Sequence, residues 1–102
     1  MNYKFRKKPV VIEAFQITRT TRADNKDWPE WLNKAWCLEK DAVGAVLPSK
    51  FPDSDGTDQL AINTLEGKMT VGWDDYIIQG VAGELYACKE DIFIRTYEKV
   101  TD

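Results

Sequence analysis

The pattern of apolar and polar positions predicts one amphipathic helix and several short strands. After Asp27, apolar residues recur at spacings of three, four, seven and eight, as on one face of a helix: Trp28, Trp31, Leu32, Ala35 and Trp36. Asp27 and Glu30 have the spacing of a capping box, and Pro29 lies in the first turn, where proline is tolerated. We therefore expect a tryptophan-rich helix that begins near Trp28 and packs on the remaining elements.

The other apolar residues alternate with polar ones or form short runs, which is typical of β-strands. Residues 9–18 and 42–47 each predict a strand, the second ended by Pro48, and residues 19–26 and 49–58 predict polar loops. Two hairpins are expected, one from residues 60–71 with its turn at Glu66–Gly67, the other from residues 76–88 around Gly80 and Gly83. Residues 89–95 fit a helix or a strand, and we favour a helical turn followed by a short strand through residues 97–100.

These elements predict an α+β fold with a curved antiparallel sheet, the tryptophan-rich helix packed on it and a short C-terminal helical turn. The length of 102 residues and an apolar content of 43% fit a single domain over residues 1–102, with a basic leader at 1–8 that is a candidate for flexibility. No apolar run has the length of a membrane span or signal-peptide core. We therefore expect a cytoplasmic protein that does not bind membranes.

Charge is distributed unevenly, although the net charge is only −3. Through Arg22 there are six basic residues and one acidic residue, whereas acidic residues outnumber basic ones two to one in the remainder. The leader interleaves Tyr3 and Phe5 with a basic group formed by Lys4, Arg6, Lys7 and Lys8. Such a segment could bind nucleic acid or an acidic protein, but a solvated terminus is the favoured interpretation and nucleic acid an unlikely partner.

Histidine is absent, which removes the commonest general base and the commonest neutral metal ligand. The chain has no phosphate-binding glycine loop, zinc-ligand spacing or dinucleotide fingerprint. We expect no catalytic residues, metal or cofactor, so an enzyme would have to rely on carboxylate, lysine or tyrosine chemistry. Cys37 and Cys88 are predicted to be buried free thiols, and the adjacency of Cys88 and Lys89 is weak evidence for a reactive thiolate.

Acidic residues in turns have simpler explanations than metal binding or catalysis. Residues 53–58 resemble the start of a calcium loop, but Thr64 stands where the closing glutamate would be needed, so a solvated turn is favoured. Asp74 and Asp75 are expected to accept hydrogen bonds from local amides. Glu13 lies in the first strand, where it is either buried with a partner and a raised pKa or, as we favour, on the solvent side beside a lysine.

Several segments, in order, carry a resemblance to a known family: residues 7–16, 28–32, 75–78, 83–86, 88–89, 91–93 and 96–98. Together they resemble a family of short phage and prophage proteins that typically carry a Pro-Gly-Asp-Tyr turn and lack an established activity. This chain has Gly72-Trp73-Asp74 before Asp75 in place of the usual Pro-Gly, and Glu90 where the family often has proline. The resemblance implies a virus-encoded accessory protein acting inside a bacterium, and it transfers no catalytic residues.

Two functions are compatible with these observations. The leading hypothesis is a non-enzymatic binding protein whose partner is a host, defence or phage protein, contacted through a sheet edge, the turn at Trp73 and Asp75 or the basic arm. The alternative is a small-ligand binder in which Trp73, Tyr76 and Tyr86 stack on a nucleotide base and Lys89 or Arg95 contacts phosphate. Trp73 is equally compatible with a place in the core, and a homo-oligomer is possible in either case.

Overall fold

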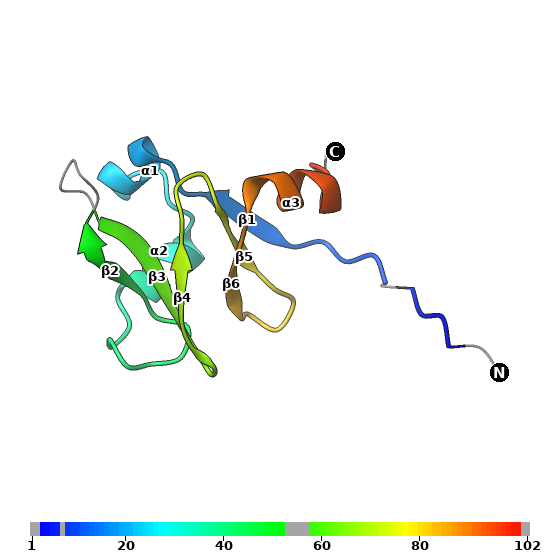
Figure 1. Ribbon diagram of the computed structural model, residues 1–102, viewed down its shortest axis with the longest axis horizontal. Coiled ribbons are helices and arrows are strands. Elements are labelled where there is room, and N and C mark those ends of the chain that lie inside the picture. Colours follow the sequence, from blue (N-terminus) through cyan, green and yellow to red (C-terminus); the bar gives the residue numbers. More distant parts are fainter. Residues whose placement is uncertain (1–2, 7, 53–57, 101–102) are drawn as a thin grey trace.

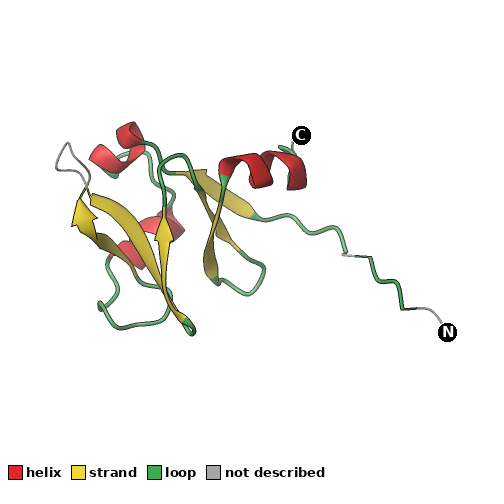
Figure 2. Ribbon diagram, in the orientation of Figure 1, coloured by secondary structure: helices red, strands yellow, loops and turns green. Residues whose placement is uncertain are grey.

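The protein has an α+β fold. The computed structural model describes residues 3–6, 8–52 and 58–100, and in these residues it has two antiparallel three-stranded sheets and three short helices (Figures 1 and 2). The first sheet has the order β1-β5-β6, with β1 (Glu13–Gln16), β5 (Tyr76–Gln79) and β6 (Leu85–Cys88). The second has the order β2-β3-β4, with β2 (Val46–Pro52), β3 (Asp58–Thr64) and β4 (Gly67–Val71). The helices are α1 (Arg19–Ala23), α2 (Glu30–Trp36) and α3 (Glu90–Thr96).

The two faces of the first sheet are covered by different elements. Phe15 of β1 lies opposite Ile77 of β5, and Ile77 lies opposite Ala87 of β6; this face packs into the core. Side chains alternate along a strand, so Tyr76 lies on the other face, where Phe93 of α3 stacks on its ring at a centroid distance of 3.8 Å. Helix α3 therefore covers the outer face of the first sheet.

Both predicted hairpins are present. Strands β3 and β4 pair from Leu60 with Val71 to Thr64 with Gly67, and the turn lies at residues 65–66, one residue before the predicted position. Strands β5 and β6 pair from Tyr76 with Cys88 to Gln79 with Leu85. Gly83 has a φ of 85° in the connection between them, but Gly80 does not have the positive φ that we expected.

The prediction that Pro48 ends a strand is wrong. Pro48 lies within β2 and is paired with Leu60 of β3. Because β2 is an edge strand, proline can lie there with the missing donor on the unpaired side. The prediction of a loop at residues 49–58 is also wrong at both ends, because residues 49–52 belong to β2 and residue 58 belongs to β3. Residues 53–57, which carry most of the calcium-like pattern, lie outside the described residues.

Two separate sheets replace the single curved sheet that we expected. Strands β4 and β6 are neighbours in space, yet they do not belong to one hydrogen-bonded sheet. At their boundary the backbone N–H of Ala87 donates to the sulfur of Met69 at 3.2 Å. A side-chain sulfur thus accepts from this amide where a continuous ladder would use a backbone carbonyl, and the sheets meet through side chains.

One hydrophobic core joins both sheets and α2. It contains residues with little or no exposure from nearly every part of the fold: Ile17, Trp28, Leu32, Ala35, Val46, Leu60, Ile62, Val71 and Ile77. Phe15, Trp31, Trp36, Trp73, Leu85 and Ala87 pack against this cluster and are partly buried. The core therefore lies between the sheets and is closed on one side by α2.

Helix α2 lies within the predicted helical segment but starts later. Its N-cap is Pro29, without a side-chain hydrogen bond, so the capping box predicted from Asp27 and Glu30 is wrong. Trp28 precedes the helix, and the buried residues of the helix itself are Leu32 and Ala35. The indole N–H of Trp28 instead donates to the carbonyl of Thr21 at 2.6 Å, which ties the segment before α2 to α1.

Helix α1 occupies part of the segment predicted to be a loop. Thr18 is its N-cap: the hydroxyl of Thr18 accepts from the amide of Thr21, and the amide of Thr18 donates to the hydroxyl of Thr21 at 2.7 Å. Helix α3 covers most of the ambiguous segment 89–95. Residues 97–100 are not a strand, so that part of the prediction is wrong.

The chain before β1 extends away from the rest of the molecule (Figure 1). This segment, residues 3–6 and 8–12, is called the arm below, and it contributes to a longest dimension of 54 Å, against 30 and 25 Å in the other directions. Among the helices of the described residues, none has the length and apolar character needed to cross a membrane.

Candidate functional site

The main candidate site is a groove between the ends of the two hairpins, which we call the hairpin groove. It has a volume of about 510 Å³. Three connections form it: the loop before β2, the β3–β4 turn and the β5–β6 connection. Its lining residues are Val43, Gly44, Asn63, Thr64, Leu65, Glu66, Met69, Ala82, Gly83, Glu84, Leu85 and Tyr86.

Exposed apolar side chains surround the hairpin groove. Leu65 in the β3–β4 turn is 89% exposed, Val81 in the β5–β6 connection is 74% exposed, and Val43 in the loop before β2 is 58% exposed. A single exposed apolar residue is ordinary, but a group at one end of a molecule is typical of an interaction surface. Glu66 and Glu84 also line the groove and make its surroundings acidic.

Local hydrogen bonds hold the three connections in place. In the β3–β4 turn the hydroxyl of Thr64 donates to the carbonyl of Gly67 at 2.6 Å. The side-chain amide of Asn63 in β3 donates to the carbonyl of Ala42 at 3.0 Å, and the backbone N–H of Gly44 donates to the carbonyl of Asn63 at 2.7 Å. The carboxylate of Glu84 accepts from the amide of Ala82 at 3.0 Å. These bonds fix the loop before β2 against β3 and the β5–β6 connection against itself, so the groove is built before any partner binds.

A smaller groove of about 240 Å³ continues from the hairpin groove toward α2 and shares Val43, Gly44, Gly83 and Leu85 with it. Trp31 lines this smaller groove, and its indole N–H is buried with no hydrogen-bond partner among the described residues. A buried unpaired donor generally costs about 1–3 kcal/mol. The indole N–H of Trp31 is therefore an unpaired polar atom buried beside this groove.

A second groove, the arm groove, lies between the base of the arm and the C-terminal end of α3. Its volume is about 650 Å³, and its lining residues are Val10, Val11, Ile12, Glu13, Ala14, Tyr76, Phe93, Tyr97, Glu98, Lys99 and Val100. Tyr76, Phe93 and Tyr97 form a stack, with centroid distances of 3.8 and 5.0 Å between successive rings. The ring of Tyr76 is thus already covered by Phe93.

Tyr86 and Tyr97 connect β6 to the end of α3. Their hydroxyl oxygens are 3.5 Å apart. The hydrogen bond to Tyr97, followed by burial, raises the pKa of Tyr86 to about 12. The structure therefore favours the protonated hydroxyl of Tyr86, which is the opposite of what activation as a base would require.

The turn before β5 arranges Trp73, Asp74 and Asp75 as local structure. Asp75 accepts a hydrogen bond from the amide of Gly72 at 2.8 Å, as expected, and Asp74 has a φ of 70°. Trp73 packs against the core and is partly buried, and the guanidinium of Arg19 lies 4.6 Å from the centroid of its ring. The ring of Trp73 is thus already covered by a cation from α1.

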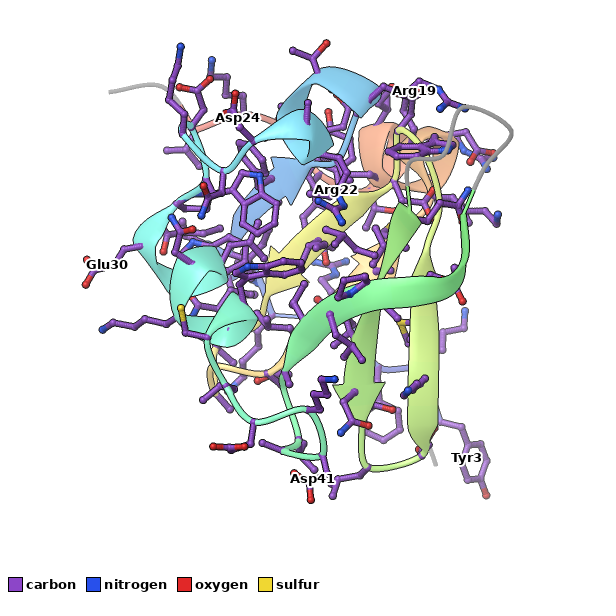
Figure 3. The ribbon with its side chains drawn as sticks, turned by 90° about the vertical axis from the view of Figure 1, so that its left-hand side faces the viewer. Tyr3, Arg19, Arg22, Asp24, Glu30 and Asp41 are labelled. Atoms are coloured by element: carbon purple, nitrogen blue, oxygen red, sulfur yellow. The ribbon has the colours of Figure 1, made fainter. Side chains whose placement is uncertain are left out.

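A second arginine of α1 covers a second tryptophan. The guanidinium of Arg22 lies 5.4 Å from the centroid of a Trp36 ring. Figure 3 shows Arg19 and Arg22 on this side of the molecule, with Glu30 projecting outward from α2 and Asp41 at the far end. These contacts attach α1 to two tryptophans that pack against the core.

The structure separates the other candidate residues. Glu13 is exposed and lines the arm groove with Tyr76, whereas Tyr86 lines the hairpin groove. Lys89 is exposed and is the N-cap of α3. Of the arm residues, Lys4, Arg6 and Lys8 are exposed, and Lys7 lies outside the described residues.

The cysteines are free, but the prediction that they are buried is wrong for Cys37, which is exposed; Cys88 is partly buried. Burial, followed by the nearby carboxylates of Asp75 and Asp91, raises the pKa of the Cys88 thiol. This shift opposes the reactive thiolate considered for the Cys88–Lys89 pair.

Sequence reasoning missed the hairpin groove. The available signal was the presence of apolar residues in turns: Leu65 beside Glu66, and Val81 between two glycines. Turns usually carry polar residues, so these positions could have indicated a surface kept apolar for binding. That the β3–β4 turn and the β5–β6 connection line one groove depends on how the two hairpins pack, which the pattern of each hairpin does not contain.

The described residues contain no group of three or more cysteine, aspartate or glutamate side chains placed to hold a metal ion. No protein-family model matches the chain, and no curated protein or solved structure shows significant similarity to it.

Proposed function

We propose that this protein is a non-catalytic binding protein that captures another protein in the hairpin groove. The observation that carries the proposal is the group of exposed apolar side chains around the groove, Val43, Leu65 and Val81, on three connections held by local hydrogen bonds. Burial of exposed apolar surface is the main favourable term in protein association. A preformed surface also avoids part of the ordering cost of binding.

The partner that fits this groove presents an apolar side chain next to basic residues. Apolar groups line much of the space between the hairpin ends, while Glu66 and Glu84 attract positive charge and disfavour acidic partners. The resemblance to short phage and prophage proteins leads us to propose a phage accessory protein in the cytoplasm of a bacterium, with a host or defence protein as its partner. Asp74 supports the resemblance, because it has the positive φ that glycine favours at the position where that family carries glycine.

The nucleotide alternative has less support than the protein partner. It needs the rings of Trp73 and Tyr76 to be open for stacking, but Arg19 covers the first and Phe93 covers the second. The hairpin groove does have the size of a small-molecule site. Its two carboxylates would repel phosphate, so a nucleotide is a poor match for it.

A charge introduced in the groove tests the proposal. We expect wild-type protein to capture a specific protein from bacterial lysate and Leu65→Glu to lose it, because the new carboxylate would have to be desolvated in the complex. Ile94→Glu is the matched control: Ile94 is also an exposed apolar residue, but it lies on α3, away from the groove. Titration calorimetry with the identified and purified partner should show at least about a tenfold weaker binding for Leu65→Glu, or about 1.4 kcal/mol.

Two results would contradict the proposal. One is equal binding of the identified partner by Leu65→Glu and wild-type protein. The other is thermal stabilisation of the wild-type protein by a nucleotide, which at a hundred times the dissociation constant would add about 2.7 kcal/mol. The second result would favour the small-ligand alternative instead.

A further inference from the structure

The arm contains a strand-forming segment that has no neighbouring strand in the part of the chain that the structure describes. Val10, Val11 and Ile12 are β-branched and precede edge strand β1 directly, yet they are not part of a strand. Val10 is 49% exposed and Val11 is 74% exposed, although valine is among the residues most often buried. An exposed run of this kind next to a sheet edge is a site at which another strand can add.

The backbone hydrogen bonds of β1 show which residues face the unpaired edge. Ile17 donates to the carbonyl of Asp75 and accepts from the amide of Asp74, so its backbone groups point toward the β5 side. Backbone direction alternates along a strand, so Phe15 and Glu13 also point toward β5, while Gln16, Ala14, Ile12 and Val10 point away from it. By the same alternation Pro9, which has no N–H, lies on the β5 side. No hydrogen-bond donor is therefore lost from the outer edge.

Helix α1 limits this edge at one end. The hydroxyl of Thr21 donates to the carbonyl of Gln16 at 3.0 Å, so this carbonyl already has a partner. The outward-facing backbone N–H and C=O groups that remain for another strand are those of Ala14, Ile12 and Val10. Those of Lys8 join them where the arm is extended.

We propose that two copies of the chain pair through this edge, with residues 8–14 of the two copies antiparallel across a two-fold axis near Val10 or Val11. Such an arrangement is self-complementary, as a two-fold interface requires. It would join the two first sheets into one continuous sheet and cover the apolar segment of each arm. The surface is separate from the hairpin groove, so this proposal and the proposed function can fail independently.

Charge complementarity favours a second copy as the occupant. In registers centred on Val10 or Val11, either Lys4 or Arg6 of one copy lies opposite Gln16 of the other. Gln16 donates its side-chain amide to the carboxylate of Glu90 at 2.6 Å, so this basic residue would lie beside an acidic group. Glu98 and Lys99 both line the arm groove near the same edge, and their charges offset each other. The basic arm of each copy thus meets the carboxylate of Glu90 of the other.

The alternation of side chains along the arm also fits a second copy as the occupant. If the arm is fully extended in the pair, alternation places Lys4, Arg6 and Lys8 on one face and Tyr3 and Phe5 on the other. In the paired arrangement the basic face lies on the side of α3, and the aromatic face lies on the side of Phe15. Phe5, which is 93% exposed in the single copy, would then be next to an apolar face.

Two proline variants distinguish this edge from any other contact of the arm. Val10→Pro removes an N–H that points to the outer edge, whereas Val11→Pro removes one that points toward the β5 side, where β5 ends at Gln79 opposite Glu13. Both residues lie outside β1, so both variants should keep the melting temperature of a monomeric wild-type sample. Sedimentation velocity from micromolar to millimolar concentration should show a dimer for wild-type protein and for Val11→Pro, and at least a tenfold larger dissociation constant for Val10→Pro.

The charge contribution is tested in the same experiment. Lys4→Glu with Arg6→Glu should weaken the dimer, and adding Glu90→Arg should restore part of the loss. A wild-type protein that stays monomeric throughout the concentration range would overturn the proposal. So would equal dimerisation by wild-type protein and Val10→Pro, or an equal loss of the dimer in both proline variants.

Discussion

At the scale of single residues, the pair formed by Tyr86 and Tyr97 makes stability depend on pH in the alkaline range. The pKa of Tyr86 is raised from an ordinary value of 10.0 to about 12, chiefly by the hydrogen bond to Tyr97 and then by burial. A raised pKa in the folded state means that folding favours the protonated hydroxyl. This contribution is fully present below about pH 10 and is lost as the pH rises toward about 12.

We therefore expect wild-type protein to lose more stability between about pH 10 and about pH 12 than Tyr86→Phe does. Urea melts at a series of pH values would measure this difference. Tyr3→Phe is the matched control, because Tyr3 lies in the arm and is largely exposed. Identical pH dependence in wild-type protein and Tyr86→Phe would show that the hydrogen bond between the two hydroxyls does not affect folding.

Asp74 is a second residue with a local effect on stability, because its backbone conformation is unfavourable. Its φ of 70° is in the left-handed region, which disfavours residues with a β-carbon, although aspartate tolerates it better than most. Asp74→Ala should therefore lower stability by about 1 kcal/mol, and Asp74→Gly should keep or raise it by up to about 1 kcal/mol. Asp74 uses its backbone to bond to Ile17, and that bond remains in both variants. Urea midpoints in the order Gly, Asp, Ala would agree with this reasoning, and the reverse order would exclude strain at this turn.

At the scale of elements, α2 depends on tertiary packing. A helix of seven residues is too short to be stable alone in water. Leu32 is fully buried on its inner face, so Leu32→Ala should cost about 2–5 kcal/mol by leaving a cavity. Lys34→Ala on the outer face should cost under about 0.5 kcal/mol, because Lys34 is exposed and forms only a surface ion pair with Glu30. If both variants had the same urea midpoint, α2 would not be part of the core.

The elements that the sequence could predict are those with a local cause. Each hairpin has alternating apolar residues around a turn, and pairing residues close in sequence needs no information from elsewhere in the chain. Helix α1 was missed because none of its residues is buried and its capping interaction uses two threonines, Thr18 and Thr21, which also suit a loop. The continuation of β2 through Pro48 depends on β2 being an edge strand, which is a property of the whole sheet.

The candidate site was harder to predict from the sequence than the elements, because its residues are brought together only by tertiary structure. The sequence suggested Trp73, Tyr76 and Lys89 as candidate residues, but the first two are covered by Arg19 and Phe93, and Lys89 is exposed at the start of α3. Arg19 and Phe93 each belong to a different element from the ring that they cover and are distant from it in the sequence. The sequence pattern could therefore not reveal these contacts. Leu65 and Gly83 belong to different hairpins and line one groove only because the two hairpins pack against each other.

At the scale of the whole molecule, the two sheets are coupled through side chains. Among the described residues no strand belongs to both sheets. The core, in contrast, contains Ile77 from the first sheet, together with Leu60 and Ile62 from the second, and all three are fully buried. Neither sheet can bury its apolar face without the other, because three short strands with one apolar side need a partner layer.

This coupling predicts a single cooperative unfolding transition despite the two separate sheets. Far-UV circular dichroism, which reports both sheets, and tryptophan fluorescence, to which three of the four tryptophans contribute from in or beside α2, should give the same midpoint in urea. Ile77→Ala in the first sheet should lower both midpoints together, with a loss of about 2–5 kcal/mol, whereas Ile94→Ala on exposed α3 should leave them nearly unchanged. Two separated transitions in wild-type protein, or a fluorescence midpoint that Ile77→Ala does not move, would mean that the second sheet and α2 fold independently. The shared core would then not be what holds the hairpin groove between the sheets together.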